Sequence, residues 1–198
     1  MIDEILVYDD IIPKHKQDQL EELFTSNKLC WLFFKDIALP ISEIKRLGIK
    51  QLTPGIACYI KQDSPKFINE NLLREVKLIP EESCKKMGKV CKDIYNARSF
   101  MHFPTPLDLK KEYDNIHVDI NYDHLVCLYY VNDSDGDTYL FDKTKKELPY
   151  LTKDSKLNIL QKVSPKKGRV VLFNGNRYHS SSAPTKDVRC IINFNVSI

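Results

Sequence analysis

Short apolar segments separated by turn residues fill the second half of this chain and restrict the folds that it can adopt. From about residue 95 the sequence contains eight candidate strands: 97–103, 115–119, 125–131, 138–141, 157–163, 169–173, 177–181 and 188–196. Clusters rich in Pro, Gly and Asn separate them, as at 104–106 and 174–176. So many short strands within about a hundred residues predict a jelly roll, as a sandwich or a barrel.

Residues 1–94 have a different texture, a mixture of helix and loop. A helix is predicted over 14–26, where apolar residues recur at helical spacing. The apolar run 31–34 predicts a short strand in the core. We expect one domain over 1–198, in which 1–94 is a helical or mixed support region and 95–198 is the β core.

Two more helices are predicted in the support region. Ser64–Pro65 is typical of a helix start, with Pro at the first helical position, and the apolar residues that follow give that helix one buried face. Pro80 is expected to end or kink it. Another short helix is predicted near 81–93, so that the helices together cover one outer face of the strands.

The composition excludes several classes of protein. Lys and Arg number 30 against 27 Asp and Glu, and their interspersed placement indicates a solvated surface and argues against a nucleic-acid stripe. The first residues lack the pattern of a signal peptide, and no apolar run approaches transmembrane length. Six cysteines without a C-x-x-C pair argue against structural zinc and disulfides. We therefore expect a cytoplasmic protein with no membrane or nucleic-acid partner.

His117 and Asp119 stand two residues apart in one candidate strand, and His179 follows sixty positions after Asp119. Side chains two apart on a strand point the same way, so His117 and Asp119 can bind one metal ion while Val118 faces away. Two histidines and one carboxylate form the facial triad that binds Fe(II) and leaves positions open for chemistry. His102 and His124 have no matched partners, and we expect them to be structural or exposed.

Arg189 begins the last candidate strand. Alternation along 188–196 places Arg189, Ile191, Asn193 and Asn195 on one face, while the opposite face is an ordinary apolar core. A guanidinium buried inside the barrel needs an anion. A dicarboxylic cosubstrate could supply one in bidentate geometry, and a protein carboxylate is the alternative.

Tyr130 lies in a candidate strand, 125–131, that is apolar on both faces. Such a strand is covered on both sides. Simple packing, with the Tyr130 hydroxyl bonded to backbone, is one explanation for this residue. Arg98 and Asn96 precede or open the first strand of the core and are candidates to point into the site.

Four segments together resemble the core of the prolyl hydroxylases, a branch of the 2-oxoglutarate- and Fe(II)-dependent dioxygenases. They are the stretch 115–132 with its His-x-Asp, the Gly-rich turn 136–138, the strand 165–173, and His179 followed ten positions later by Arg189. The resemblance covers roughly 97–196, and residues 1–94 are more weakly similar to the helical support of phage and marine microbial members.

The resemblance implies a cupin-like double-stranded β-helix in which His117, Asp119 and His179 bind Fe(II). Arg189 would pair with the distal carboxylate of 2-oxoglutarate, and Tyr130 would help to hold that carboxylate. The cofactors implied are Fe(II), 2-oxoglutarate and O2, with ascorbate as a candidate addition.

The function implied is an oxidoreductase, a hydroxylase acting on a C–H bond of a peptide or protein side chain, with proline as the first target. Two other functions stay open: hydroxylation or demethylation of a small molecule or nucleobase, and a non-catalytic β-helix binding module. Nucleic-acid demethylases of the superfamily carry a second Arg six positions after the first, where this chain has Asn195. The loop 104–116 is expected to gate the substrate.

Overall fold

The computed structural model describes residues 2–63, 66–152 and 154–198. Its helices are α1 (Lys14–Thr25), α2 (Ile41–Leu47), α3 (Glu70–Val76) and α4 (Leu78–Lys86). Its strands are β1 (Leu6–Tyr8), β2 (Leu32–Phe34), β3 (Gly55–Gln62), β4 (Phe67–Ile68), β5 (Asp93–His102), β6 (Leu125–Tyr130), β7 (Thr138–Thr144), β8 (Ile159–Val163), β9 (Val170–Asn174), β10 (Arg177–Ser181) and β11 (Arg189–Ser197).

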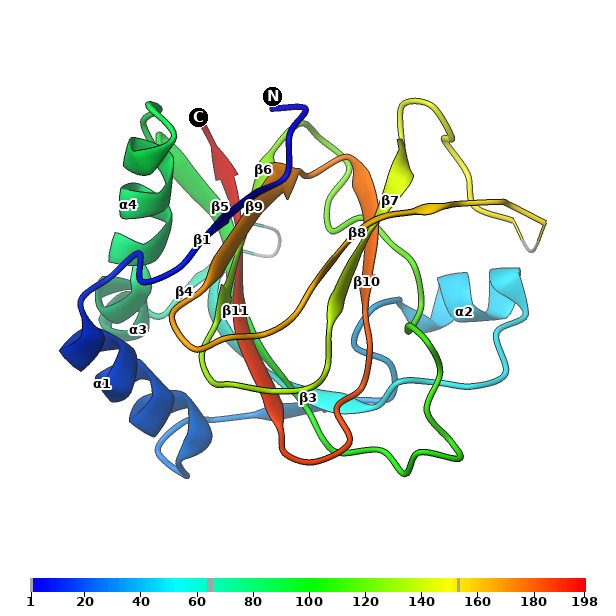
Figure 1. Ribbon diagram of the computed structural model, residues 1–198, viewed down its shortest axis with the longest axis horizontal. Coiled ribbons are helices and arrows are strands. Elements are labelled where there is room, and N and C mark those ends of the chain that lie inside the picture. The colour runs from blue at the N-terminus through cyan, green and yellow to red at the C-terminus, as the bar shows by residue number, and fades with distance from the viewer. Residues whose placement is uncertain (1, 64–65, 153) are drawn as a thin grey trace.

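Two antiparallel sheets face each other (Figure 1). The large sheet has the order β1-β9-β6-β11-β5-β3-β2, with β4 paired to β3, and the small sheet has the order β10-β7-β8. Strands that follow one another in sequence, such as β9 and β10, belong to different sheets, as in a jelly roll. The predicted double-stranded β-helix fold is confirmed.

β11 lies in the middle of the large sheet, between β5 and β6, and separates two apolar cores. Cys190, Ile192, Phe194 and Val196 belong to the core on the helix side, while Ile191 belongs to the core between the sheets. The alternation predicted for this strand is therefore confirmed. β6 likewise sends alternate residues into both cores, which explains why its sequence is apolar on both faces.

The helices α1, α3 and α4 lie together on the outer face of the large sheet (Figure 1). Their apolar stripes supply Phe24, Val76 and Ile79 to the helix-side core, and all three side chains are fully buried. The expected helical cover of one outer face is thus confirmed. α2 lies apart from them, beside β10.

The support region also contributes strands that the sequence did not predict. β3 pairs with β5 and extends the large sheet. Its buried and partly buried residues do not alternate regularly, so the sequence lacks a clear strand pattern here. β2 forms where a strand was expected, but Leu32 and Phe33 are 48% and 69% exposed and do not join the core. This strand lies at the edge of the sheet, so only one of its two sides is paired with another strand.

Two helix boundaries differ from the predictions. The predicted start at Ser64–Pro65 lies outside the described residues, and α3 instead begins after Asn69, whose side chain accepts a hydrogen bond from the backbone N–H of Leu72. α4 ends at Lys86, well short of 93, because the chain leaves the helix at Gly88, which adopts a positive φ of 71°. Pro80 lies within the first turn of α4, where it is tolerated.

The segment 115–119 is not a strand, contrary to prediction. His117 forms only an isolated bridge to His179. The carbonyl of Asn115 accepts hydrogen bonds from the side chains of His117 and Ser180, so it is not free to extend a ladder. Val118 nevertheless packs beside Tyr139 and Phe141, as expected for a side chain that alternates with His117 and Asp119.

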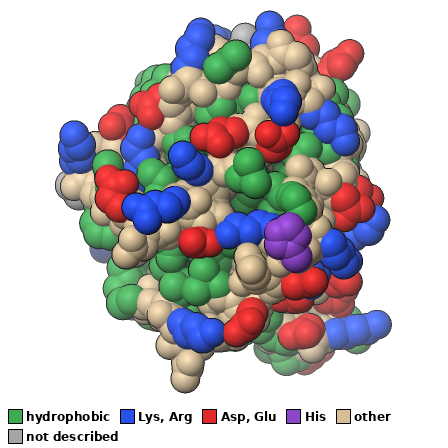
Figure 2. Space-filling model, turned by 90° about the vertical axis from the view of Figure 1, so that its left-hand side faces the viewer, with side chains coloured by type: hydrophobic (Ala, Val, Ile, Leu, Met, Phe, Trp, Pro, Cys, Tyr) green, Lys and Arg blue, Asp and Glu red, His purple; other side chains and the backbone are tan. Residues whose placement is uncertain are grey.

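Positive and negative side chains are mixed on the helix-covered face (Figure 2). Several form ion pairs between elements, including Lys167 with Asp18 and Glu21, and Lys16 with Glu75. This face has the expected solvated character and no stripe of one sign. None of the helices in the described ranges has the length and hydropathy needed to span a membrane.

Phe194 tests the position of the helix-side core, in which it is fully buried. Phe194→Ala should lower the free energy of unfolding by about 3–5 kcal/mol, because it removes a large apolar side chain and leaves a cavity. Chemical denaturation measures this loss. Val90→Ala is the control: Val90 is 72% exposed, so the change should stay within about 0.5 kcal/mol. Equal losses in the two variants would contradict the assignment of the core.

Candidate metal centre

The isolated bridge brings His117 and His179 side by side. The N–H of His117 donates to the carbonyl of His179 at 3.0 Å, and the N–H of His179 donates to the carbonyl of His117 at 3.1 Å. The two imidazole ring centroids are 4.5 Å apart. Backbone pairing between the segment after β5 and strand β10 therefore joins two ligands that lie far apart in sequence.

The tautomer of each histidine is fixed by a backbone carbonyl two residues earlier. Nδ1 of His117 lies 3.0 Å from the carbonyl of Asn115, and Nδ1 of His179 lies 3.0 Å from the carbonyl of Arg177. A carbonyl only accepts, so each Nδ1 carries the hydrogen and each Nε2 presents a lone pair. An imidazole held in this way is oriented for a metal ion.

Asp119 completes the cluster from the same segment as His117. Its Oδ1 lies 3.7 Å from Nε2 of His117 and 3.6 Å from Nε2 of His179. The three ligand atoms all lie within 4.8 Å of one another. The other oxygen, Oδ2, accepts hydrogen bonds from the side-chain amides of Asn193 and Asn195, both at 2.8 Å. One oxygen is thus held by the protein and the other is turned toward the histidines.

Electrostatics prepare these groups for a cation. Burial lowers the pKa of His117 to about 4, with the charge of His179 adding to the effect, so this ring is neutral near pH 7. Burial alone would raise the pKa of Asp119, but the two histidines and Arg98 hold it well below its usual range. Burial would also lower the pKa of His179, but Asp119 outweighs it and raises this pKa above its ordinary value. Of the three groups, His179 is therefore the one at which a proton competes most with a metal ion.

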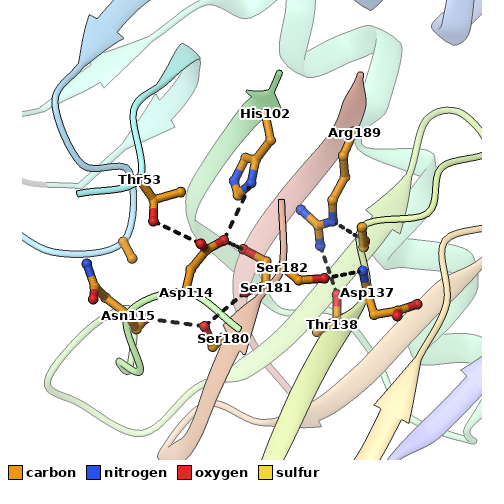
Figure 3. Close-up of polar contacts among 12 residues, drawn as sticks. Thr53, His102, Asp114, Asn115, Asp137, Thr138, Ser180, Ser181, Ser182 and Arg189 are labelled. Atoms are coloured by element: carbon orange, nitrogen blue, oxygen red, sulfur yellow. Dashed lines mark hydrogen bonds and ion pairs between the residues drawn. The ribbon is translucent and has the colours of Figure 1, made fainter. Parts of the chain in front are cut away.

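Arg189 is 2% exposed and lies at the start of β11, away from the histidines. Its Nε donates to the carbonyl of Gly136 at 2.7 Å, and its Nη2 donates to the hydroxyl of Thr138 at 2.8 Å (Figure 3). No carboxylate among the described residues is close enough to form an ion pair with it. The alternative in which Arg189 pairs with a protein carboxylate is therefore not supported.

Gly136 allows the chain to approach Arg189 closely. A Cβ at this position would lie 2.6 Å from the carbonyl oxygen of Ser182 and 2.8 Å from Cδ of Arg189. Any larger residue would therefore push the guanidinium aside. This close approach gives a physical reason for the glycine in the turn 136–138.

Tyr130 lies behind Arg189. The guanidinium carbon lies 5.7 Å from the centre of the Tyr130 ring, and the Tyr130 hydroxyl donates to the hydroxyl of Thr138 at 2.7 Å. Tyr130 is fully buried and does not line the cavity described below. Its contacts place it where it supports Thr138 and Arg189.

His102 and Asp114 form a second buried polar group beside Arg189 (Figure 3). His102 is paired with Arg189 across β5 and β11, and its Nδ1 lies 3.8 Å from a carboxylate oxygen of Asp114. Thr53 donates to the other oxygen of Asp114 at 2.9 Å. Burial raises the pKa of Asp114, while burial and the charge of Arg189 hold the pKa of His102 well below its ordinary value.

The sequence alone did not assign His102 and Asp114 to the site. The expectation that His102 is structural or exposed is incomplete, because it is buried and lines the cavity that also holds the metal ligands. Alternation along β5 from Arg98 to His102 was the signal that could have placed it. His124 is structural: its ring is buried, and its Nδ1 donates to the carbonyl of Tyr122 at 2.8 Å.

One cavity of about 720 Å³ contains the whole cluster. Its wall includes the three metal ligands, Arg189 and Arg98, together with parts of the segments 34–47 and 145–151. Asn96 does not line it, and its side chain instead accepts from the backbone N–H of Asp63. Of the loop 104–116, only Ile116 lines this cavity, and several other residues of the loop line a separate hollow of about 280 Å³.

The fold is shared with solved structures of very low sequence identity. An oxidoreductase of the 2OG-Fe(II) oxygenase family from Burkholderia pseudomallei matches with a TM-score of 0.62 and 9% identity, over 98% of this chain and 84% of that one. A prolyl hydroxylase from Trichoplax adhaerens, in complex with a hypoxia inducible factor peptide fragment, matches with a TM-score of 0.58 and 13% identity, over 97% and 82%.

A third structure is the non-heme, alpha-ketoglutarate-dependent epimerase SnoN from nogalamycin biosynthesis. It matches with a TM-score of 0.65 and 8% identity, over 98% of this chain and 78% of that one. No protein-family model matches this sequence, and no curated protein matches it either. The similarity therefore establishes the jelly-roll architecture common to these oxygenases.

Metal affinity should depend on pH through His179. Co(II) binding is expected to weaken as pH falls through the raised pKa of His179, by up to about tenfold per pH unit below that pKa, because the proton then competes with the metal ion for Nε2. His117 and Asp119 do not take up protons near that pKa. Titration of Co(II) at several pH values measures the effect, and His15→Ala, which changes a histidine of α1, should give the same profile. A flat profile would contradict the assignment of His179 as a ligand.

Proposed function

We propose that this protein is an Fe(II)- and 2-oxoglutarate-dependent dioxygenase that hydroxylates a C–H bond. The observation that carries the proposal is the arrangement in one cavity: three preoriented ligand atoms together with a buried arginine that has no carboxylate partner among the described residues. A binding module without catalysis would have no need for both features. The shared fold with 2OG-Fe(II) oxygenases supports the same conclusion.

The ligand set fits Fe(II). Two imidazoles and one carboxylate are the composition of a facial triad. Backbone carbonyls hold Nδ1 of each histidine, and an amide holds one oxygen of Asp119, so the three ligand atoms are turned toward a common point. Bound iron would supply the activation of O2 that drives hydroxylation. His117, Asp119 and His179 would hold it, with cosubstrate positions left open.

Arg189 would bind the distal carboxylate of 2-oxoglutarate. Gly136 and Thr138 occupy two of its donors and fix the direction of the guanidinium, while Tyr130 supports it from behind. Preorganisation of this kind lowers the entropy that binding must lose. In the buried position the charge pair would also be weakly screened. An oxygenase whose Asp119 carboxylate is intact is expected to hydroxylate, not to halogenate.

We propose a peptide or protein side chain, with proline first, as the primary substrate. Support comes from the 115–132 segment and from neighbours that are prolyl hydroxylases, one with a bound peptide fragment. A small molecule is the second candidate, because the epimerase SnoN shares the fold. A nucleic-acid substrate is disfavoured because Asn195, at the position of a second arginine in the demethylases, is used to hold Asp119.

Succinate production from 2-oxoglutarate, measured with Fe(II) and panels of peptides, amino acids and nucleosides, tests the function and the substrate class together. Stimulation by proline-containing peptides is the expected result. Stimulation by a free amino acid or a nucleoside alone would favour the small-molecule candidate. No turnover with or without any addition would contradict the enzyme assignment.

Asp119→Ala should abolish succinate production and weaken metal retention, because one of three ligands is lost and the amides of Asn193 and Asn195 lose their acceptor. Succinate release and bound metal are measured on the same samples. Asp123→Ala is the matched control, since this nearby carboxylate pairs with Lys146 on the surface, and it should keep both. Full turnover by Asp119→Ala would remove the basis for the metal site.

Arg189→Ala should raise the Michaelis constant for 2-oxoglutarate on the order of a hundredfold, because a carboxylate would be buried without its partner. Arg189→Lys should be intermediate, since Lys keeps the charge and loses the bidentate fork. Arg74→Ala, on the exposed face of α3, is the control and should not change the constant. An unchanged constant in Arg189→Ala would mean that another basic residue binds the cosubstrate.

A further inference from the structure

Arg98 is the one cation lining the cavity that has no polar partner among the described residues. Four basic side chains line the wall: Arg46, Arg98, Lys145 and Arg189. Arg46 pairs with Glu43 at 2.6 Å, and Lys145 donates to the side chain of Asn121. Arg189 donates to Gly136 and Thr138. The guanidinium of Arg98 forms neither a hydrogen bond nor an ion pair with another described residue, although it is half-buried.

The acidic side chains of the wall are already occupied. Asp36 accepts hydrogen bonds from the backbone N–H groups of Ala38, Leu39 and Thr53 and from the side chain of Asn115. Glu43 pairs with Arg46, and Asp119 belongs to the metal ligands. No carboxylate of the cavity wall therefore forms an ion pair with Arg98, and a half-buried guanidinium without a direct partner is costly.

The register of the large sheet separates Arg98 from the arginine assigned to the cosubstrate. His102 pairs with Arg189, Phe100 with Ile191, and Arg98 with Asn193. Four residues along a strand correspond to roughly 13 Å. Arg98 thus lies at the level of Asn193, which holds Asp119, while Arg189 lies at the other end of the row. Its charge contributes to the low pKa of Asp119, which agrees with this placement.

The side chain of Arg98 is held in place by an aromatic ring. Its guanidinium carbon lies 5.0 Å from the centre of the Phe100 ring, and Phe100 is two residues further along β5 on the same face. Packing on a ring leaves the edge of the guanidinium, which carries its donors, free for an oxyanion that accepts two parallel hydrogen bonds. Arg98 is therefore oriented to bind a ligand in the cavity, unlike a surface arginine that is free in solvent.

We propose that Arg98 binds an oxyanion of the primary substrate, a carboxylate or a phosphate, close to the metal centre. The inference rests on the proposed function, because it takes Arg189 as the partner of 2-oxoglutarate. A guanidinium offers two parallel donors to either anion. For a peptide substrate the anion would be a terminal carboxylate, an acidic side chain or a phosphorylated side chain beside the hydroxylated residue.

Matched pairs of small probes test the proposal without knowledge of the natural substrate. Calorimetry would be performed on protein loaded with Co(II) and saturated with 2-oxoglutarate. The pairs are N-acetylproline and its amide, the α-amides of N-acetylglutamate and N-acetylglutamine, and capped phosphoserine and serine. At least one acidic probe should bind about tenfold or more tightly than its neutral partner. Of the three pairs, the one with the largest ratio of affinities shows whether the anion is a carboxylate or a phosphate.

Arg98→Gln should reduce that ratio to within about twofold, and Arg98→Lys should retain part of it, because charge persists and the fork is lost. Arg46→Gln is the matched control: it removes another cation from the wall, one already paired with Glu43, and should keep the full ratio. Thermal unfolding of each variant shows whether it is folded. The affinity for 2-oxoglutarate should stay within about threefold of the wild-type value in Arg98→Gln.

Three results would overturn the proposal. One is wild-type protein that binds 2-oxoglutarate but shows no preference for any acidic probe. Another is an unchanged preference in Arg98→Gln. The last is a loss of 2-oxoglutarate affinity in Arg98→Gln as large as the loss for the acidic probe, which would assign Arg98 to the cosubstrate. Failure of the wild-type protein to bind 2-oxoglutarate with Co(II) would instead contradict the proposed function itself.

Discussion

The site depends on the two hydrogen bonds that the side-chain amides of Asn193 and Asn195 donate to Asp119. Both amides come from β11 in the large sheet, whereas His179 comes from β10 in the small sheet. Asp119 lies on an irregular segment between them and could not be positioned by a strand ladder of its own. Two hydrogen bonds to Oδ2 fix the direction of the carboxylate, and its other oxygen, Oδ1, is turned toward Nε2 of both histidines.

β11 connects this site to the stability of the fold. One face of the strand belongs to the helix-side core, and the other presents Arg189, Ile191, Asn193 and Asn195 to the space between the sheets. The polar residues of the inner face are costly to bury, and the fully buried apolar residues of the outer face offset that cost. A rigid strand with a packed back can therefore carry several functional groups in fixed register.

Two arginines of the cavity lie at different levels of this inner face. Arg189 is fixed by Gly136 and Thr138 at one end, and Arg98 lies without a polar partner at the level of the metal ligands. Each guanidinium packs near an aromatic ring, Tyr130 for Arg189 and Phe100 for Arg98. Two arginines about four residues apart in register suit two different anions better than one, since in the proposed function 2-oxoglutarate would bind Arg189 and the metal and would leave Arg98 free.

The sequence by itself determined the jelly-roll class and the alternation of β11 and β6, and it singled out His117, Asp119, His179 and Arg189, which the structure brings to one cavity. These follow from local periodicity and from the chemistry of residue types, which act over short stretches of chain. Tertiary structure alone decided that 115–119 is irregular, that β3 joins the sheet, and that Asn193, Asn195 and His102 belong to the site. It also showed which cations already have partners. Hydrogen bonds between distant segments decide these points, and a single sequence does not encode them in any local pattern.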